Sequence, residues 1–103
     1  MKQSRKNLPV LRQARYNHSS CSIGYVAYLF GGQSSKSEYL YSIESLAIDS
    51  EGSTQAREWS IINLKGFKPR MMALTVAFKD CLVILGGEDA QAKLSDGIVI
   101  NMT

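Results

Sequence analysis

The chain has 103 residues, of which 45% are hydrophobic and 20% are charged, with two cysteines and two prolines. This length allows one small domain with a single core, and the composition excludes a chain that is disordered throughout. No apolar stretch approaches the roughly 18 residues that a membrane helix needs, and the N-terminus lacks the apolar region of a secretory signal. We therefore expect a cytoplasmic protein with no membrane partner.

Positive charge is concentrated at the start of the chain, although the net charge is only +3. The basic residues of this part are Lys2, Arg5, Lys6, Arg12 and Arg15, and no acid lies among them. A basic N-terminal leader over residues 1–11 fits either a solvated segment or an arm that binds nucleic acid. We favour the solvated segment over a nucleic-acid partner, because no aromatic residues are interleaved with the basic ones.

Two short strands are predicted in the first half of the chain. The segments His18–Ile23 and Tyr25–Phe30 form a hairpin around a glycine, which tolerates positive φ. The run Val26–Phe30 is almost continuously apolar and stops at two adjacent glycines. Such a run predicts a strand inside the sheet with both of its faces covered.

The segment LYSIESLAID, after a polar turn at 33–38, fits either a strand or a helix. Three of its apolar residues also match a helical stripe. The equivalent segment of the second half, Ile98–Ile100, is β-branched and follows an Asp-Gly turn signal. We therefore predict a third strand in both halves, the first over residues 42–48.

The remaining strands complete one unit and begin a second. A polar loop over 49–58 leads to a fourth strand over 58–64, which carries Trp59. In the second half, Ala73–Phe78 and Cys81–Leu85 form another hairpin, whose second strand is again apolar and again ends at a glycine pair. The second unit ends before any fourth strand.

The two halves are therefore one unit repeated. Gly31 and Gly86 lie 55 positions apart, and the same shift aligns Arg15 with Arg70. Repeats arise where a unit cannot bury its own apolar face and needs a neighbour. The glycine pairs lack the context of a phosphate-binding loop, so we interpret them as points where a side chain would clash as the strand leaves the sheet.

From Arg12 onward these features resemble the kelch repeat, a family in which each repeat forms one four-stranded blade of a β-propeller. The residues that carry the resemblance are Arg15, Gly31, Gly32, Trp59, Pro69, Arg70, Gly86 and Gly87. It implies an all-β fold, a partial β-propeller of roughly two four-stranded antiparallel blades, with one repeat at 12–68 and a second, incomplete repeat at 69–103. We expect a piece of a longer propeller, a truncated gene product, or a chain whose propeller is completed by further kelch blades or a second chain.

Catalysis and metal binding have little support in the sequence. His18 and Cys21 have a metal-like spacing, but a closed zinc site needs four ligands, and the chain has one histidine and two cysteines. Both cysteines lie in predicted strands, which favours reduced core thiols over a disulfide. No serine lies in a nucleophile elbow. We predict a protein that is not an enzyme and has no cofactor or metal; a fragment of a propeller enzyme is the alternative.

The resemblance implies a protein-interaction function. In kelch propellers the loops between the second and third strands, and the segments that lead into the first strand, gather at one mouth and contact partners. In this sequence they supply the candidate partner-binding residues Tyr16, Asn17, Gln33, Ser34, Ser35, Lys36, Met71, Met72, Glu88, Asp89 and Gln91. We interpret Arg15 and Arg70 as ties between neighbouring blades. Family members often serve as substrate-recruiting subunits of ubiquitin ligases or as cytoskeletal partners, so we expect a non-catalytic scaffold with a protein partner.

Overall fold

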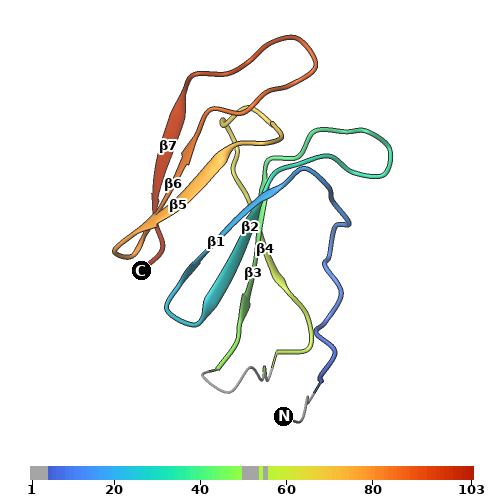
Figure 1. Ribbon diagram of the computed structural model, residues 1–103, viewed down its shortest axis with the longest axis vertical. Coiled ribbons are helices and arrows are strands. Elements are labelled where there is room, and N and C mark those ends of the chain that lie inside the picture. Colours follow the sequence, from blue (N-terminus) through green and yellow to red (C-terminus); the bar gives the residue numbers. More distant parts are fainter. Residues whose placement is uncertain (1–4, 50–53, 55) are drawn as a thin grey trace.

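The computed structural model describes residues 5–49, 54 and 56–103, and within these ranges the chain forms strands and no helix (Figure 1). The strands are β1 (Ser19–Ile23), β2 (Val26–Phe30), β3 (Ser42–Ala47), β4 (Ser60–Asn63), β5 (Leu74–Phe78), β6 (Cys81–Leu85) and β7 (Gly97–Asn101). Lys2, the start of the predicted leader and part of the predicted polar loop lie outside the described residues. The predicted all-β fold is confirmed.

The strands form two antiparallel sheets, each of which follows the order of the chain. The first sheet has the order β1-β2-β3-β4, and the second sheet has the order β5-β6-β7. Cys21 lies opposite Tyr28 in the first sheet, and Val76 lies opposite Val83 at the equivalent position of the second. The segment that fitted either a helix or a strand is β3, in which Ile43 and Leu46 point to opposite faces of the sheet and are both buried.

The fourth strand is shorter than predicted. Pairing with β3 runs only from Ser60 to Asn63, so Trp59 lies just before the strand. Trp59 is nevertheless buried, and its indole N–H donates to the carbonyl oxygen of Pro9 at 2.8 Å. The tryptophan therefore holds the end of the predicted leader against the first sheet.

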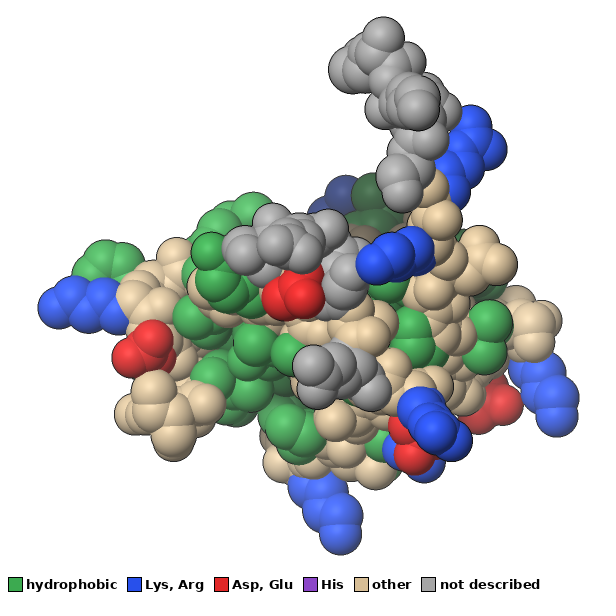
Figure 2. Space-filling view, turned by 90° about the horizontal axis from the view of Figure 1, so that it is seen from below, with side chains coloured by type: hydrophobic (Ala, Val, Ile, Leu, Met, Phe, Trp, Pro, Cys, Tyr) green, Lys and Arg blue, Asp and Glu red, His purple; other side chains and the backbone are tan. Residues whose placement is uncertain are grey.

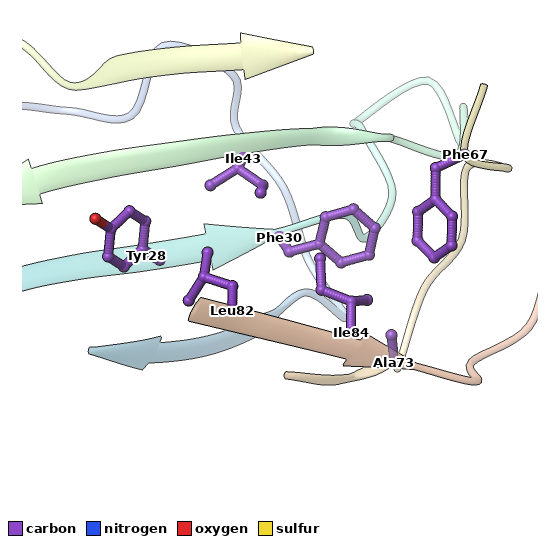
Figure 3. Close-up of a cluster of buried hydrophobic side chains, with 7 residues drawn as sticks. All are labelled: Tyr28, Phe30, Ile43, Phe67, Ala73, Leu82 and Ile84. Carbon is purple, nitrogen blue, oxygen red and sulfur yellow. The ribbon is translucent and has the colours of Figure 1, made fainter. Parts of the chain in front are cut away.

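The core lies between the two sheets (Figure 3). Its buried members are Tyr28, Phe30 and Ile43 from the first sheet, Leu82 and Ile84 from the second, and Phe67 and Ala73 from the segment that joins them. The rings of Phe30 and Phe67 are 6.0 Å apart between centroids and tilted by 45°. Because side chains of both sheets and of the connecting segment form one cluster, each sheet buries its apolar face against the other.

The prediction that both faces of the apolar strands are covered is wrong for β6. Leu82 and Ile84 are fully buried on the face that meets the first sheet, whereas Leu85, on the other face, is 45% exposed. β6 lies between β5 and β7, so it is central within its sheet. The unbroken apolar pattern identified the position within the sheet correctly, but only one face of β6 has a neighbour that buries it.

A buried arginine anchors the segment that leads into the first sheet. The Arg15 guanidinium donates to the carbonyl oxygens of Gly31 and Ser42, both at 3.1 Å. It also pairs with Glu44 Oε2 at 2.6 Å, and neither charged side chain is exposed to solvent. Glu44 in turn accepts two backbone N–H groups of the same lead-in segment, at 2.6 and 3.1 Å. A buried charge persists only where such partners surround it.

The second sheet repeats this anchor with a more exposed acid. The Arg70 guanidinium donates to the Gly86 carbonyl oxygen at 3.0 Å and to the two carboxylate oxygens of Asp96 at 2.6 and 3.1 Å. It also lies over the Phe67 ring, 3.9 Å from its centroid. The Asp96 side chain is 57% exposed, unlike that of Glu44. Arg70 lowers the pKa of Asp96 through its hydrogen bonds and charge.

The Arg15 guanidinium bonds within its own repeat. The Arg70 side chain bonds to the second repeat but also donates from Nε to the Lys68 carbonyl oxygen of the first repeat, at 2.9 Å. The interpretation of the arginines as ties between blades therefore stays a prediction for the side chains, and the main chain of Arg70 supplies a direct tie. Its carbonyl oxygen accepts the Gly32 N–H at 2.9 Å, and its N–H donates to the Leu40 carbonyl oxygen at 3.2 Å. The backbone at one end of the first sheet is therefore bonded directly to the lead-in segment of the second.

The first glycine of each pair has the same conformation but different surroundings. Gly31 has φ 66°, and a Cβ there would lie 2.6 Å from the Arg70 carbonyl oxygen. Gly86 has φ 67°, but its Cβ would meet only the Leu94 carbonyl oxygen, at an ordinary 3.5 Å. The predicted clash is confirmed at Gly31 and wrong at Gly86, where only the left-handed backbone disfavours a side chain. At the second glycine of each pair, Gly32 or Gly87, an added Cβ would clash with the backbone of the segment that leads into the same sheet.

None of the described residues forms a helix long and apolar enough to cross a membrane.

We predict that Gly31→Ala destabilises the chain more than Gly86→Ala does. Both substitutions place alanine in the left-handed region, at a cost of about 1–2 kcal/mol. Only the first also pushes a methyl group into a backbone oxygen of the other sheet. Urea unfolding of the two variants measures the difference, with Gly66→Ala as the control, because Gly66 also has positive φ but open space around it. Equal midpoints for Gly31→Ala and Gly66→Ala would contradict the steric role.

We also predict that Glu44→Gln destabilises the chain more than Asp96→Asn does. Glu44 and Arg15 are both fully buried, and removing one partner of such a pair costs about 3–5 kcal/mol. Arg70 is equally buried, but the Asp96 carboxylate is 57% exposed, so water already screens their attraction and less stability is lost with that charge. Thermal unfolding followed by far-UV circular dichroism tests this order, and a larger loss for Asp96→Asn would show that the Glu44 pair is not the stronger anchor.

Candidate functional site

The loops between β2 and β3 and between β6 and β7 lie at the same end of the two sheets, the upper end in Figure 1. The lead-in segments of both sheets, residues 12–18 and 67–73, reach this end as well. We call this part of the molecule the loop end. It contains all the residues that the sequence analysis selected for partner binding.

Within each repeat, the lead-in segment is paired with the following loop. Tyr16 forms an isolated antiparallel bridge with Gln33, and Met71 forms the equivalent bridge with Glu88. In both cases the two backbones exchange hydrogen bonds of 2.8–3.0 Å. The lead-in and loop residues are therefore held together in both repeats.

The two repeats are joined at the loop end through Asn17. Its carbonyl oxygen accepts the Met72 N–H at 2.8 Å, and its side-chain amide lies 3.7 Å from the Met71 sulfur. Asn17 and Met72 both have φ 57°, a conformation that is rare for a residue as bulky as methionine. These contacts make the loop end one continuous surface with a fixed backbone.

The selected side chains differ in what they offer to a partner. Tyr16 is 46% and Met72 63% exposed, so both present large apolar surfaces to solvent. Ser35 and Lys36 are exposed as well. Ser34 is buried, and its hydroxyl accepts the backbone N–H groups of residues 36 and 38 within its own loop. Its side chain shapes the loop instead of facing solvent.

Acidic and basic side chains share the β6–β7 loop. The Lys68 ammonium lies 2.8 Å from the Asp89 carboxylate, and the Lys93 ammonium lies 3.8 Å from that of Glu88. The hydrogen bond from Lys68, with backbone N–H groups of the loop, lowers the pKa of Asp89 to about 2. Asp89 accepts the N–H groups of Gln91 and residue 92, so it also fixes the turn.

Two recesses at the loop end include residues that the sequence analysis did not select. One, of about 410 Å³, is lined by Tyr41, Lys65, Gly66, Phe67 and Pro69. A smaller one, of about 180 Å³, is lined mainly by polar residues of the β2–β3 loop together with Gln13. Tyr41 and the segment at 65–69 are distant in sequence and meet because the Leu64 N–H donates to the Tyr41 carbonyl oxygen. No local sequence signal could have predicted that contact.

The residues considered for metal binding or redox chemistry are His18, Cys21 and Cys81. Within the described ranges, no group of three or more His, Cys, Asp or Glu side chains could hold a metal ion. Cys21 in β1 and Cys81 in β6 are both free thiols. Burial raises the pKa of the Cys21 thiol, which makes it a poorer nucleophile at neutral pH.

The comparison with known proteins agrees with this geometry. No curated protein matches the chain. Residues 14–48, which contain the first arginine anchor, β1, β2, the first glycine pair and β3, match the model of the kelch motif. The structure repeats that unit in the second half, with the same anchor, glycine pair and strand order, so the two sheets are two blades of a partial β-propeller. The kelch-motif match over residues 14–48, together with this repeated architecture, supports a kelch-repeat family.

Proposed function

We propose that the chain is a non-catalytic protein-interaction module and that it binds its partner at the loop end. The observation that carries this proposal is the continuity of that surface: backbone hydrogen bonds join the lead-in segments and loops of both repeats. Exposed Tyr16 and Met72 project from it. Tyrosine and methionine are enriched at protein interfaces, where they contribute large contact areas.

The fixed backbone of the loop end supports recognition. A surface that is already ordered loses less conformational entropy on binding than a mobile loop does. Here the bridges at Tyr16 and Met71 and the buried hydroxyl of Ser34 constrain the loops before any partner arrives. Left-handed residues such as Met72 are strained, and strained residues cluster at functional sites.

The charges of the loop end favour a protein over a nucleic acid as partner. Exposed Lys36 and Glu38 share the β2–β3 loop. In the β6–β7 loop Glu88 lies 3.8 Å from Lys93, so both signs are interspersed. A nucleic-acid backbone would instead require a continuous run of cations. A partner protein can match a mixed surface with its own acids and bases, which gives specificity.

The recess lined by Tyr41 and Phe67 supplies a place for an apolar side chain of the partner. Interfaces usually contain such an anchor, surrounded by polar contacts that exclude water. We propose that the partner is a protein of the kind that kelch repeats recruit, either a substrate of a ubiquitin ligase or a cytoskeletal component. The cytoplasm is the compartment that suits both, and it also suits two free thiols.

A displayed library of random peptides tests the proposed surface and requires no purified partner. Peptides selected on the full chain should lose at least about tenfold in affinity for a Tyr16→Ala/Met72→Ala variant, because both side chains lie at the centre of the proposed interface. Tyr25→Ala is the matched control, since Tyr25 is 66% exposed but lies at the turn between β1 and β2, at the opposite end. Unchanged binding by the double variant, or equal loss in the control, would refute the proposal.

The low pKa of Asp89 predicts that the β6–β7 loop keeps its shape in acid. Because folding lowers this pKa from 3.8 to about 2, the Asp89 contribution to stability is complete above 3.8 and is lost as the pH falls through about 2. Carboxyl chemical shifts measured by NMR should give a midpoint near 2, which Lys68→Ala should raise toward the ordinary value. A midpoint that Lys68→Ala does not move would rule out the proposed cause.

A further inference from the structure

The contact between the two sheets is between different faces of equivalent units. The first sheet contributes Cys21, Tyr28 and Phe30, whereas the second contributes Leu82 and Ile84 from the opposite face of its own strands. Shifting Tyr28 by 55 positions leads to Val83, which lies on the face of the second sheet that is turned away. The contact is therefore head to tail. The face that the first sheet uses has an unpaired equivalent on the second sheet, and the face that the second sheet uses has an unpaired equivalent on the first.

One unpaired half is the outer face of the second sheet, which we call the open face. Cross-strand pairing places its side chains together, and they are Leu74, Val76, Phe78, Val83, Leu85 and Val99. Phe78 is 66% and Val99 65% exposed. Hydrophobic side chains are exposed at the end of the molecule seen in Figure 2. A contiguous apolar surface of this kind marks an interaction site.

The other unpaired half is the corresponding face of the first sheet. On β1 and β2, the repeat equivalents of the residues that the second sheet turns toward the core are Ser20, Ser22, Ala27 and Leu29. On β3 of the same face, Glu44 and Leu46 are already buried, so only the β1 and β2 part of the face is open. Ser20 and Ser22 are exposed, and Ala27 and Leu29 are partly buried. Serines replace more apolar residues here, so a contact with the open face would be weaker than the contact inside the chain.

Backbone groups on the two unpaired halves match as donors and acceptors. Inside the chain, three hydrogen bonds join the repeats: Gly32 N–H to Arg70 O, Arg70 N–H to Leu40 O, and Met72 N–H to Asn17 O. On the open side, the equivalent groups of the second repeat are the Gly87 N–H and the carbonyl oxygens of Leu94 and Met72.

The complementary groups of the first repeat are the Arg15 carbonyl oxygen and the N–H groups of Arg15 and Asn17. No hydrogen bond joins any of these six groups to another described residue. Unpaired backbone groups beside an apolar face are a strong drive toward pairing.

The space around Gly86 also indicates that a neighbouring unit is absent on this side of the second sheet. The equivalent Gly31 is needed because the Arg70 carbonyl oxygen lies 2.6 Å from where a Cβ would be. Around Gly86 that oxygen has no counterpart, and the space is open except for the Leu94 carbonyl oxygen. The counterpart of Arg70 in the other repeat is Arg15, so the Arg15 carbonyl oxygen of a second copy would complete the site.

We propose that a second copy of this chain docks its first sheet on the open face, so that copies associate head to tail through a repetition of their own internal contact. The lead-in segment of the incoming copy places Arg15 and Asn17 against the loop of the second repeat at Gly87. Such an interface closes into a ring if its rotation allows. With two blades in each copy, closure takes about two to four copies, because propellers usually have four to eight blades. This inference does not depend on the proposed function, since peptide binding and self-association are measured separately.

Two variants that each block one half of the contact test this proposal. Inside the chain, the Ser19 and Thr75 hydroxyls are in contact, so their equivalents Leu74 and Ser20 should meet between copies. Leu74→Arg and Ser20→Arg both change exposed residues and should leave circular dichroism unchanged. In sedimentation velocity the wild type should show a mass that rises with concentration, and each variant alone should remain monomeric.

A mixture of the two variants should form a 1:1 dimer that grows no further, because each variant retains the half that the other has lost. Association of Ser20→Arg alone would overturn the proposal, since it would mean that two open faces pair with each other. A wild-type chain that stays monomeric at all concentrations would overturn it too, and would leave the open face to a further blade.

Gly86→Ala adds a readout at the loop. An alanine there meets no described backbone atom more closely than 3.5 Å, so folding should tolerate it about as well as Gly66→Ala. The added methyl group should nevertheless abolish self-association, because it would occupy the place of the incoming Arg15 carbonyl oxygen. Normal association of Gly86→Ala would contradict the placement of that oxygen.

Discussion

The fold depends on a guanidinium that is buried where the chain enters each sheet. A charge removed from water requires several fixed partners, and Arg15 finds them in the end of β2, the start of β3 and the carboxylate of Glu44. These segments are far apart in the sequence, so the ion pair and its hydrogen bonds set the position of the lead-in segment relative to the strands. The β2–β3 loop must then project from the same end, which is where the candidate surface lies.

The glycine pair is a consequence of this anchor. The Gly31 carbonyl oxygen must point toward Arg15, which requires a left-handed turn directly after a buried strand. The second repeat has the same turn and the same bond from Arg70 to Gly86. The acids are not equivalent, however, because Glu44 lies in the sheet without solvent contact and Asp96 lies mostly in solvent. The first repeat is therefore held more tightly by its anchor than the second.

The local features of this structure were predictable from the sequence, whereas the contacts between repeats were not. Apolar runs and turn signals located the strands of the described residues, and the repeat resolved β3, which periodicity alone left open. Strand ends differed, as at Trp59, because pairing with a neighbour decides where a strand stops. The main-chain contact of Arg70 was not predicted for a related reason: its spacing from Gly86 is visible in the sequence, but the bond between its main chain and Gly32 depends on how the two sheets approach.

The candidate surface was also predictable only in part, because some of its features are local and others depend on the fold. Tyr16, Gln33, Met71 and Glu88 could be placed at one end because the repeat assigns them equivalent positions in turns. The burial of Ser34 and the recess beside Tyr41 depend on the path of each loop in three dimensions. A repeat also predicts surfaces that a single unit would not. The face that one sheet buries against its neighbour has an equivalent face on the neighbouring sheet, and that equivalent face has no partner inside the chain. Here that surface is apolar, and its backbone groups match the opposite side of the same chain, so the unsatisfied half of the contact is a property of the repeat and not of either sheet alone.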